Sequence, residues 1–283
     1  MTALVGVAGA VTAVTGFEKG SGKTTFLSFL MPHARRAGPV GVFTIGSDSG
    51  PGTRQAARVP EIRVEPGDVV LTTEPLARAS QARFEILETV PGRAAQGHLL
   101  LGRARRAGSV ALVGAEHFSA LGRALALVRA EGWAASVLID GSVNRITQVS
   151  ALGDLQFAWT VRADRNNLAR VATRMKFLDR VARLPLESPE PEGRLRLEGP
   201  LTGEGLRALP AGSRGFSVED FTKIFVEPAE FLRALERLDV RVRRSWPLLL
   251  FAVILRNLGR EEFLAAVGPE VGSRVLFNPH EVP

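Results

Sequence analysis

Residues able to bind a polyphosphate lie close together near the start of the chain, in the run Gly20-Ser21-Gly22-Lys23-Thr24-Thr25. Glycines let successive backbone N–H groups converge on phosphate oxygens, and a lysine reaches the outer phosphates. We expect Gly20, Ser21 and Gly22 to contact phosphates and Lys23 to pair with the β- and γ-phosphates. The hydroxyl of Thr24 is expected to bind Mg²⁺, and that of Thr25 to contact the α-phosphate.

The sequence around this run is that of a P-loop, with one difference in spacing. An apolar stretch ending in Val14-Thr15 precedes the run and an apolar segment follows it, so the loop is expected between a strand and a helix whose N-terminus attracts anions. The usual pattern places its first glycine where this chain has Phe17, whereas the glycine here is Gly16. The loop is therefore either one residue longer or entered differently, and the alternative is a glycine-rich turn that caps a helix. Lys19 is given only a supporting electrostatic role.

A carboxylate that could complete a magnesium site follows a buried strand later in the chain. Residues 136–139 read Ser-Val-Leu-Ile and end in Asp140, which we interpret as the Walker B residue; the alternative is an aspartate that caps a turn. Lys23 and Asp140 are thus the candidate catalytic residues. Gly141 occupies the place where many ATPase motors have a catalytic glutamate, which favours slow hydrolysis and the kinase and GTPase branch of the fold.

Other charged residues have weaker functional interpretations. Glu74 and Glu116 each follow a predicted strand and could orient a water, and Asp48 ends another strand, although ordinary loop positions are the alternative for each. The cluster Arg103, Arg105 and Arg106 could close over phosphates or form a solvated basic helix face. No [NT]-K-x-D element that reads guanine is present, so ATP is preferred to GTP.

Composition narrows the class of protein. The chain has 283 residues, no cysteine and a formal net charge of +7, with arginine supplying nearly all the basic residues. Aromatic residues are not interleaved with the basic clusters, so nucleic-acid binding is disfavoured. No apolar run reaches the length of about 20 residues that a membrane helix needs. Without disulfides or thiolate ligands, we expect a cytoplasmic protein with no membrane association.

The order of predicted elements indicates an α/β fold: a P-loop NTPase-like, mainly parallel sheet with helices on both faces, plus a small C-terminal α/β appendage. Predicted strands are residues 11–15, 40–46, 68–72, 109–114, 135–140 and 157–161. Predicted helices follow Lys23, His117 and Asn166. Prolines and acids in residues 184–194 predict a linker. We therefore expect a nucleotide-binding domain over residues 1–183 and an α/β region over residues 195–283.

Four segments together resemble the smaller subunit of the reactivating factor for lysine 5,6-aminomutase, an adenosylcobalamin-dependent enzyme. They are residues 16–25, 67–73, 139–145 and 166–183. The chain departs from that family at Ser142, where alanine is usual, and at Arg162-Ala163, where a Gly-Ala pair is usual. The resemblance implies ATP binding and hydrolysis used to exchange damaged cobalamin, with the aminomutase and a second reactivase subunit as protein partners.

Switch loops that order around the γ-phosphate would give this role a physical basis, and the candidates are residues 47–54 and 141–150. Two other classes stay open. A small-molecule kinase would use Asp140 or Asp48 to position an acceptor hydroxyl and the Arg103 cluster to close over it. A binding module would respond to nucleotide without useful turnover.

Overall fold

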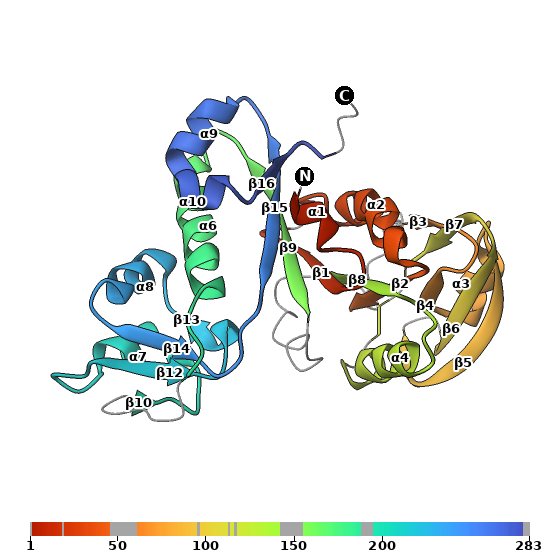
Figure 1. The fold of residues 1–283 in the computed structure, drawn as a ribbon, viewed down its shortest axis with the longest axis horizontal. Coiled ribbons are helices and arrows are strands. Elements are labelled where there is room, and N and C mark those ends of the chain that lie inside the picture. The colour runs from red at the N-terminus through yellow and green to blue at the C-terminus, as the bar shows by residue number, and fades with distance from the viewer. Residues whose placement is uncertain are drawn as a thin grey trace. The chain divides into compact units, whose positions relative to one another are not determined.

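The chain divides into two compact units in a computed structural model, which describes residues 2–18, 20–45, 61–94, 97–112, 114–115, 118–141, 155–187 and 195–279. Unit 1 comprises Met1–Val161 together with Asn278–Pro283, and unit 2 comprises Arg162–Phe277. Figure 1 labels most of the helices and strands of both.

Unit 1 is built on a mainly parallel sheet. In the order in which they pair, its strands are β9 (Gln156–Ala163, whose last two residues belong to unit 2), β1 (Val11–Gly16), β8 (Ser136–Gly141), β2 (Val40–Ile45), β4 (Val69–Thr73), β6 (Gly97–Arg106) and β5 (Arg83–Ala94). The strands from β9 to β4 run parallel, whereas β6 and β5 add an antiparallel hairpin at the far edge. The predicted α/β class with a mainly parallel sheet is confirmed.

The parallel strands form because their sequences are nearly continuous apolar runs, as expected for strands covered on both faces. Helix α2 (Lys23–Ala34) leads from β1 to β2, and α4 (Phe118–Ala130) leads back to β8. Because the two crossovers run in opposite directions along the sheet, right-handed connections place the helices on opposite faces, as Figure 1 shows. Leu121, Leu125 and Val128 of α4 are buried, and Gly132 after it has a φ of 62°.

One predicted strand forms but pairs with a different strand than expected, and the β5–β6 hairpin was not predicted. The segment expected at residues 109–114 forms β7 (Gly108–Ala111), which pairs antiparallel with β3 (Glu61–Val64) in a separate two-stranded sheet. Among the described residues between β4 and α4, the short α3 (Glu74–Ala79) is followed by the hairpin β5–β6. The remaining elements of unit 1 are α1 (Thr2–Val5) and the 3₁₀ helix η1 (Arg35–Ala37).

A buried carboxylate, Asp68, connects several of these elements. Its Oδ2 accepts hydrogen bonds from Arg35 Nη2 at 2.6 Å and from the Glu65 N–H at 2.8 Å. Its Oδ1 accepts from the Val40 N–H at 3.1 Å. Asp68 is 1% exposed, so each of these bonds compensates the loss of water around a charge. The start of β2 and the turn before β4 are thereby fixed to the end of α2.

Unit 2 is a smaller α/β assembly. Its elements are α6 (Leu168–Ala182), β10 (Leu195–Arg196), β11 (Leu201–Thr202), α7 (Gly203–Arg207), β12 (Gly215–Val218), η4 (Phe221–Lys223), β13 (Ile224–Phe225), α8 (Pro228–Leu235), β14 (Asp239–Val242), β15 (Leu248–Leu255), α9 (Arg260–Val267), α10 (Pro269–Gly272) and β16 (Val275–Phe277). Strands β10, β12 and β14 form a parallel sheet, and β15 pairs parallel with β16.

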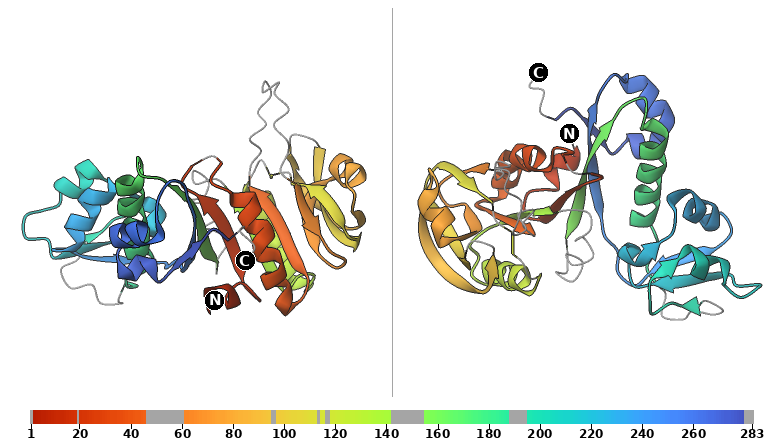
Figure 2. Two further views of the ribbon diagram at one scale, coloured as in Figure 1. Left: turned by 90° about the horizontal axis from the view of Figure 1, so that it is seen from above. Right: turned by 180° about the vertical axis from the view of Figure 1, so that it is seen from behind.

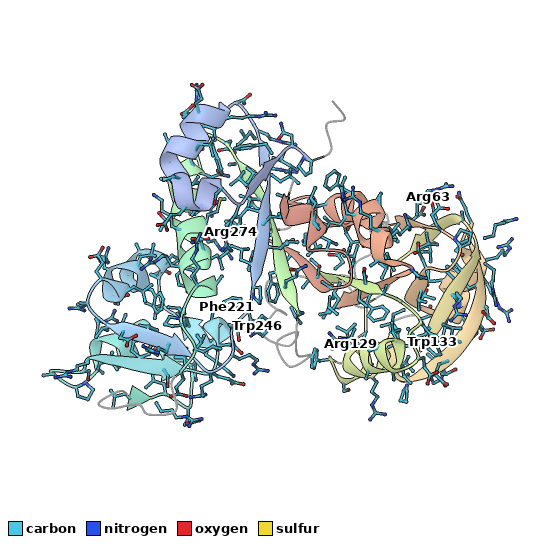
Figure 3. All side chains as sticks on the ribbon, viewed as in Figure 1. Arg63, Arg129, Trp133, Phe221, Trp246 and Arg274 are labelled. Atoms are coloured by element: carbon cyan, nitrogen blue, oxygen red, sulfur yellow. The ribbon has the colours of Figure 1, made fainter. Side chains whose placement is uncertain are left out.

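The long helix α6 packs against α8 and α9, with its Asp179 buried and paired to Arg183 and Arg274. Figure 3 labels Arg274, and also Phe221 and Trp246, whose ring centroids lie 5.6 Å apart in an edge contact within unit 2.

The boundary between the two compact units falls after Val161, whereas the sequence predicts a domain that continues through residue 183. Residues 184–187 of the predicted linker are partly paired, because Leu186 bridges to Val242; residues 188–194 lie outside the described residues. The domain assignment from sequence stays a prediction.

Candidate functional site

The glycine loop, residues 16–22, connects the carboxyl end of β1 to α2; within it, Lys19 lies outside the described residues. Gly20 and Gly22 have φ angles of 77° and 87°, a backbone conformation that favours glycine. Gly22 accepts the first helical hydrogen bond, from the Phe26 N–H at 2.9 Å, and Lys23 is the first helical residue. The first N–H groups of a helix have no carbonyl partner within it, so this end of α2 is suited to an anion.

The structure brings together two residues that the sequence separates widely. Thr24 Oγ1 donates a hydrogen bond to Asp140 Oδ2 at 3.0 Å. This happens because β8, which ends at Gly141, lies directly beside β1, with Val14 and Asp140 in register. Asp140 is 7% exposed. A hydroxyl and a carboxylate are therefore held together beside the start of α2, as the sequence predicts for a Mg²⁺ site.

A third oxygen borders this pair and was not predicted. Thr44 on β2 is in register with Asp140, so the two side chains share one face of the sheet. The Oγ1 atom of Thr44 is buried and has no hydrogen-bond partner among the residues that the structure describes. The signal in the sequence is a threonine placed one residue before the end of the second buried strand, which is too common to have identified it alone.

Gly16 explains the unusual spacing of the loop. A Cβ atom at this position would lie 1.9 Å from Ser21 Oγ and 2.6 Å from Thr160 Oγ1. The loop folds back over Gly16, so the close approach requires glycine here rather than at Phe17. Phe17 instead extends the pairing of β1 with β9: its N–H donates to Thr160 O at 3.3 Å, and its ring contacts Trp159 edge-on.

Several other predicted residues are not brought to the loop. Glu74 begins α3, is exposed and pairs with Arg78 one helical turn later. Asp48, Glu116 and the first candidate switch segment, residues 47–54, lie outside the described residues. Of the second, residues 141–150, only Gly141 is described, at the end of β8. Lys23 and Thr25 occupy the first turn of α2 as expected, with Lys23 half-buried and Thr25 exposed.

The arginine cluster does not belong to this site. Arg103, Arg105 and Arg106 lie on strand β6, not on a helix as one interpretation expected. Arg103 pairs in register with Val69, the first residue of β4, so the cluster lies at the amino-terminal edge of the parallel strands. The glycine loop follows the opposite, carboxyl-terminal edge. Arg103 and Arg105 also form ion pairs with Glu85. Closure of this cluster over a phosphate at the loop is therefore not supported.

His33, on α2, is a histidine whose pKa is shifted by its surroundings. It lies in the last turn of this helix, away from Lys23, against the ring of Phe29. Burial lowers the pKa of His33, and the positive charge of Arg36 lowers it further. Its neutral imidazole is consistent with a packing role.

The donors present fit a hard divalent cation. Mg²⁺ is usually bound by one or two protein oxygens with waters and phosphates completing the shell, and Thr24 with Asp140 provide such oxygens. Within the described ranges, no group of three or more His, Cys, Asp or Glu side chains could hold a metal by itself, so phosphates would have to contribute ligands. No helix in the described part of the chain is long and apolar enough to cross a membrane.

Comparisons with known proteins add no relative: no protein-family model, no curated protein and no solved structure matches the chain. The interpretation of the site therefore depends on its own geometry.

Proposed function

We propose that the protein binds Mg·ATP at the glycine loop and hydrolyses it slowly, as a P-loop NTPase. The observation that carries this proposal is the 3.0 Å hydrogen bond between Thr24 and Asp140, located beside a helix N-terminus that follows two glycines with positive φ. An aspartate that only capped a turn at the end of a strand would not be expected to bond to a threonine that follows the glycine loop.

The role of each residue follows from its place. The N–H groups of the loop and of the first turn of α2 bind the phosphates, and Lys23 adds a positive charge for the β- and γ-phosphates. Mg²⁺ held by Thr24, with Asp140 acting through its water ligands, would neutralise charge on the phosphates. Asp140 is followed by Gly141, which cannot orient an attacking water. Slow turnover in the isolated protein is therefore expected.

The first test removes the hydroxyl or the charge of the metal pair. In Thr24→Val and Asp140→Asn, ATP affinity measured by calorimetry should lose most of its dependence on Mg²⁺, with a weakening of about tenfold or more in Mg²⁺ because a charge-assisted interaction is lost. Ser28→Ala is the matched control, since Ser28 carries an exposed hydroxyl on the same helix, which donates to the backbone carbonyl Thr24 O. Unchanged Mg²⁺ dependence in both variants would exclude the metal assignment.

We further propose, from the resemblance to the reactivase subunit, that the ATPase serves to exchange damaged cobalamin in lysine 5,6-aminomutase. A second reactivase subunit would be the other partner. A small-molecule kinase is the alternative, but the position of the Arg103 cluster at the opposite sheet edge removes its predicted phosphate-closing group.

The partner assignment predicts stimulated turnover. Phosphate release by the protein should rise at least about tenfold when aminomutase carrying inactive cobalamin is added, because a partner that completes the site lowers the barrier by the corresponding free energy. Lys23→Ala should give no stimulation under the same conditions. Phosphate transfer to a metabolite, with no response to the aminomutase, would instead identify the kinase.

A further inference from the structure

We propose that Thr160 is a positioning residue that sets the conformation of the glycine loop for polyphosphate binding. The inference rests on the proposed nucleotide binding and adds to it a residue on a strand that contributes no phosphate ligand. Thr160 lies on β9, in register with Gly16 at the start of the loop.

A directed chain of hydrogen bonds joins the loop to this strand. Thr160 Oγ1 donates its single hydrogen to Thr15 O at 3.1 Å. Ser21 Oγ lies 2.8 Å from Thr160 Oγ1, so the serine must be the donor in this second bond. Ser21 and Thr160 are 1% and 2% exposed, which shields both bonds from competing water.

The position of Ser21 gives these bonds their importance. Ser21 is the residue between Gly20 and Gly22, both of which have positive φ and are conformationally free compared with other residues. Fixing the serine side chain fixes the peptide groups on either side of it, and with them the directions of the N–H groups that would meet phosphate. Because ordering a loop on binding costs affinity, a loop already ordered by Thr160 binds more tightly.

The direction of the Ser21 hydroxyl determines which of its groups can bind phosphate. Its hydroxyl is directed inward to β9, so the contribution of Ser21 to phosphate binding is its backbone N–H and not its side chain. The Ser21–Thr160 hydrogen bond orders the loop backbone, which would bind ADP and ATP in the same way. Loss of this bond should therefore raise the dissociation constants of ADP and ATP by the same factor.

The test is Thr160→Val, which keeps the shape of the side chain and removes the hydroxyl. The dissociation constants of Mg·ADP and Mg·ATP, measured by calorimetry, should each rise by about fivefold to tenfold, because the loop loses the buried hydrogen bond that orders it. Thr160→Ser should restore affinity to near that of the unmodified protein. Ser21→Ala should also weaken both ligands, by no more than Thr160→Val, because both variants remove the Ser21–Thr160 bond and Thr160→Val also removes the bond to Thr15 O. The double variant should be no weaker than Thr160→Val.

Thr12→Val is the matched control. Thr12 lies at the other end of the same strand pair, is fully buried, and accepts a hydrogen bond from Gln156 at 3.0 Å. Thr12→Val also loses a buried hydrogen bond, so its melting temperature should fall about as much as that of Thr160→Val. Its nucleotide affinity should be unchanged.

Equal affinities in Thr160→Val and the unmodified protein would overturn the positioning role, as would equal effects of Thr160→Val and Thr12→Val on affinity. If the unmodified protein binds Mg·ATP, and Lys23→Ala does not, that result overturns the positioning role alone. Absence of Mg·ATP binding by the unmodified protein would overturn the proposed function and this inference together.

Discussion

Lys23→Ala is expected to abolish Mg·ATP binding at millimolar nucleotide, corresponding to a loss of affinity of about a hundredfold or more. Lys23 is the first residue of α2, at the end of the loop whose glycines have positive φ. Its ammonium group would be the one lysine charge directed to the outer phosphates, and several charge-assisted hydrogen bonds are lost with it. Calorimetric titration with Mg·ATP measures the change directly.

The control for this variant is Lys176→Ala, which removes the same charge from an exposed position on α6 in unit 2. Nonspecific attraction of a basic protein for nucleotide would fall equally in both variants. Retained affinity in Lys23→Ala, or equal losses in both, would mean that the glycine loop is not the nucleotide site. Circular dichroism spectra of the variants establish that each is folded.

Asp68→Ala is expected to lower the free energy of unfolding of unit 1 by about 3–5 kcal/mol, because a buried carboxylate that accepts several hydrogen bonds is lost and its donors are left without an acceptor. Asp68 accepts from Arg35, Val40 and Glu65, so Arg35 and two backbone N–H groups would lose their acceptor. Urea denaturation followed by circular dichroism provides the measurement.

Glu74→Ala is the comparison for Asp68→Ala, since it breaks an ion pair of the same kind between exposed side chains on α3. Such i,i+4 pairs contribute only about 0.3–0.5 kcal/mol. Comparing the losses of unfolding free energy in Asp68→Ala and Glu74→Ala tests whether burial determines how much such an interaction stabilises the protein. A loss below about 1 kcal/mol for Asp68→Ala would show that the buried pair offsets little more than its own desolvation.

The sequence predicted the elements whose pattern is nearly uniform. Strands β1, β2 and β8 are apolar runs buried on both faces, and the glycine run before α2 has few alternative structures. The pairing of Thr24 with Asp140 could be predicted because the carboxyl ends of parallel strands meet at one edge of a sheet.

The hairpin β5–β6 could not be identified in this way. Strand β5 mixes charged and apolar residues, and its Ile86 is 57% exposed, so β5 lacks the pattern of a covered strand. Strand β6 has a short buried apolar run, but exposed residues flank it on both sides. β7 resembles a buried parallel strand in composition, yet its partner is β3, and pairing is decided by distant residues. Thr160 was missed for a similar reason: its contact with Ser21 depends on which strand lies beside β1.

The strand that carries Thr160 also restricts how the protein can be dissected. Unit 1 ends at Val161 and resumes at Asn278, so unit 2 is an insertion in the chain of unit 1, and its first residues complete β9. Truncation after Val161 removes the last two residues of that strand, as well as the returning C-terminal segment. A fragment for studying the glycine loop by itself should therefore keep β9 whole and rejoin it to Asn278 through a designed connection; Figure 2 lets the path of the strand be followed from two further directions.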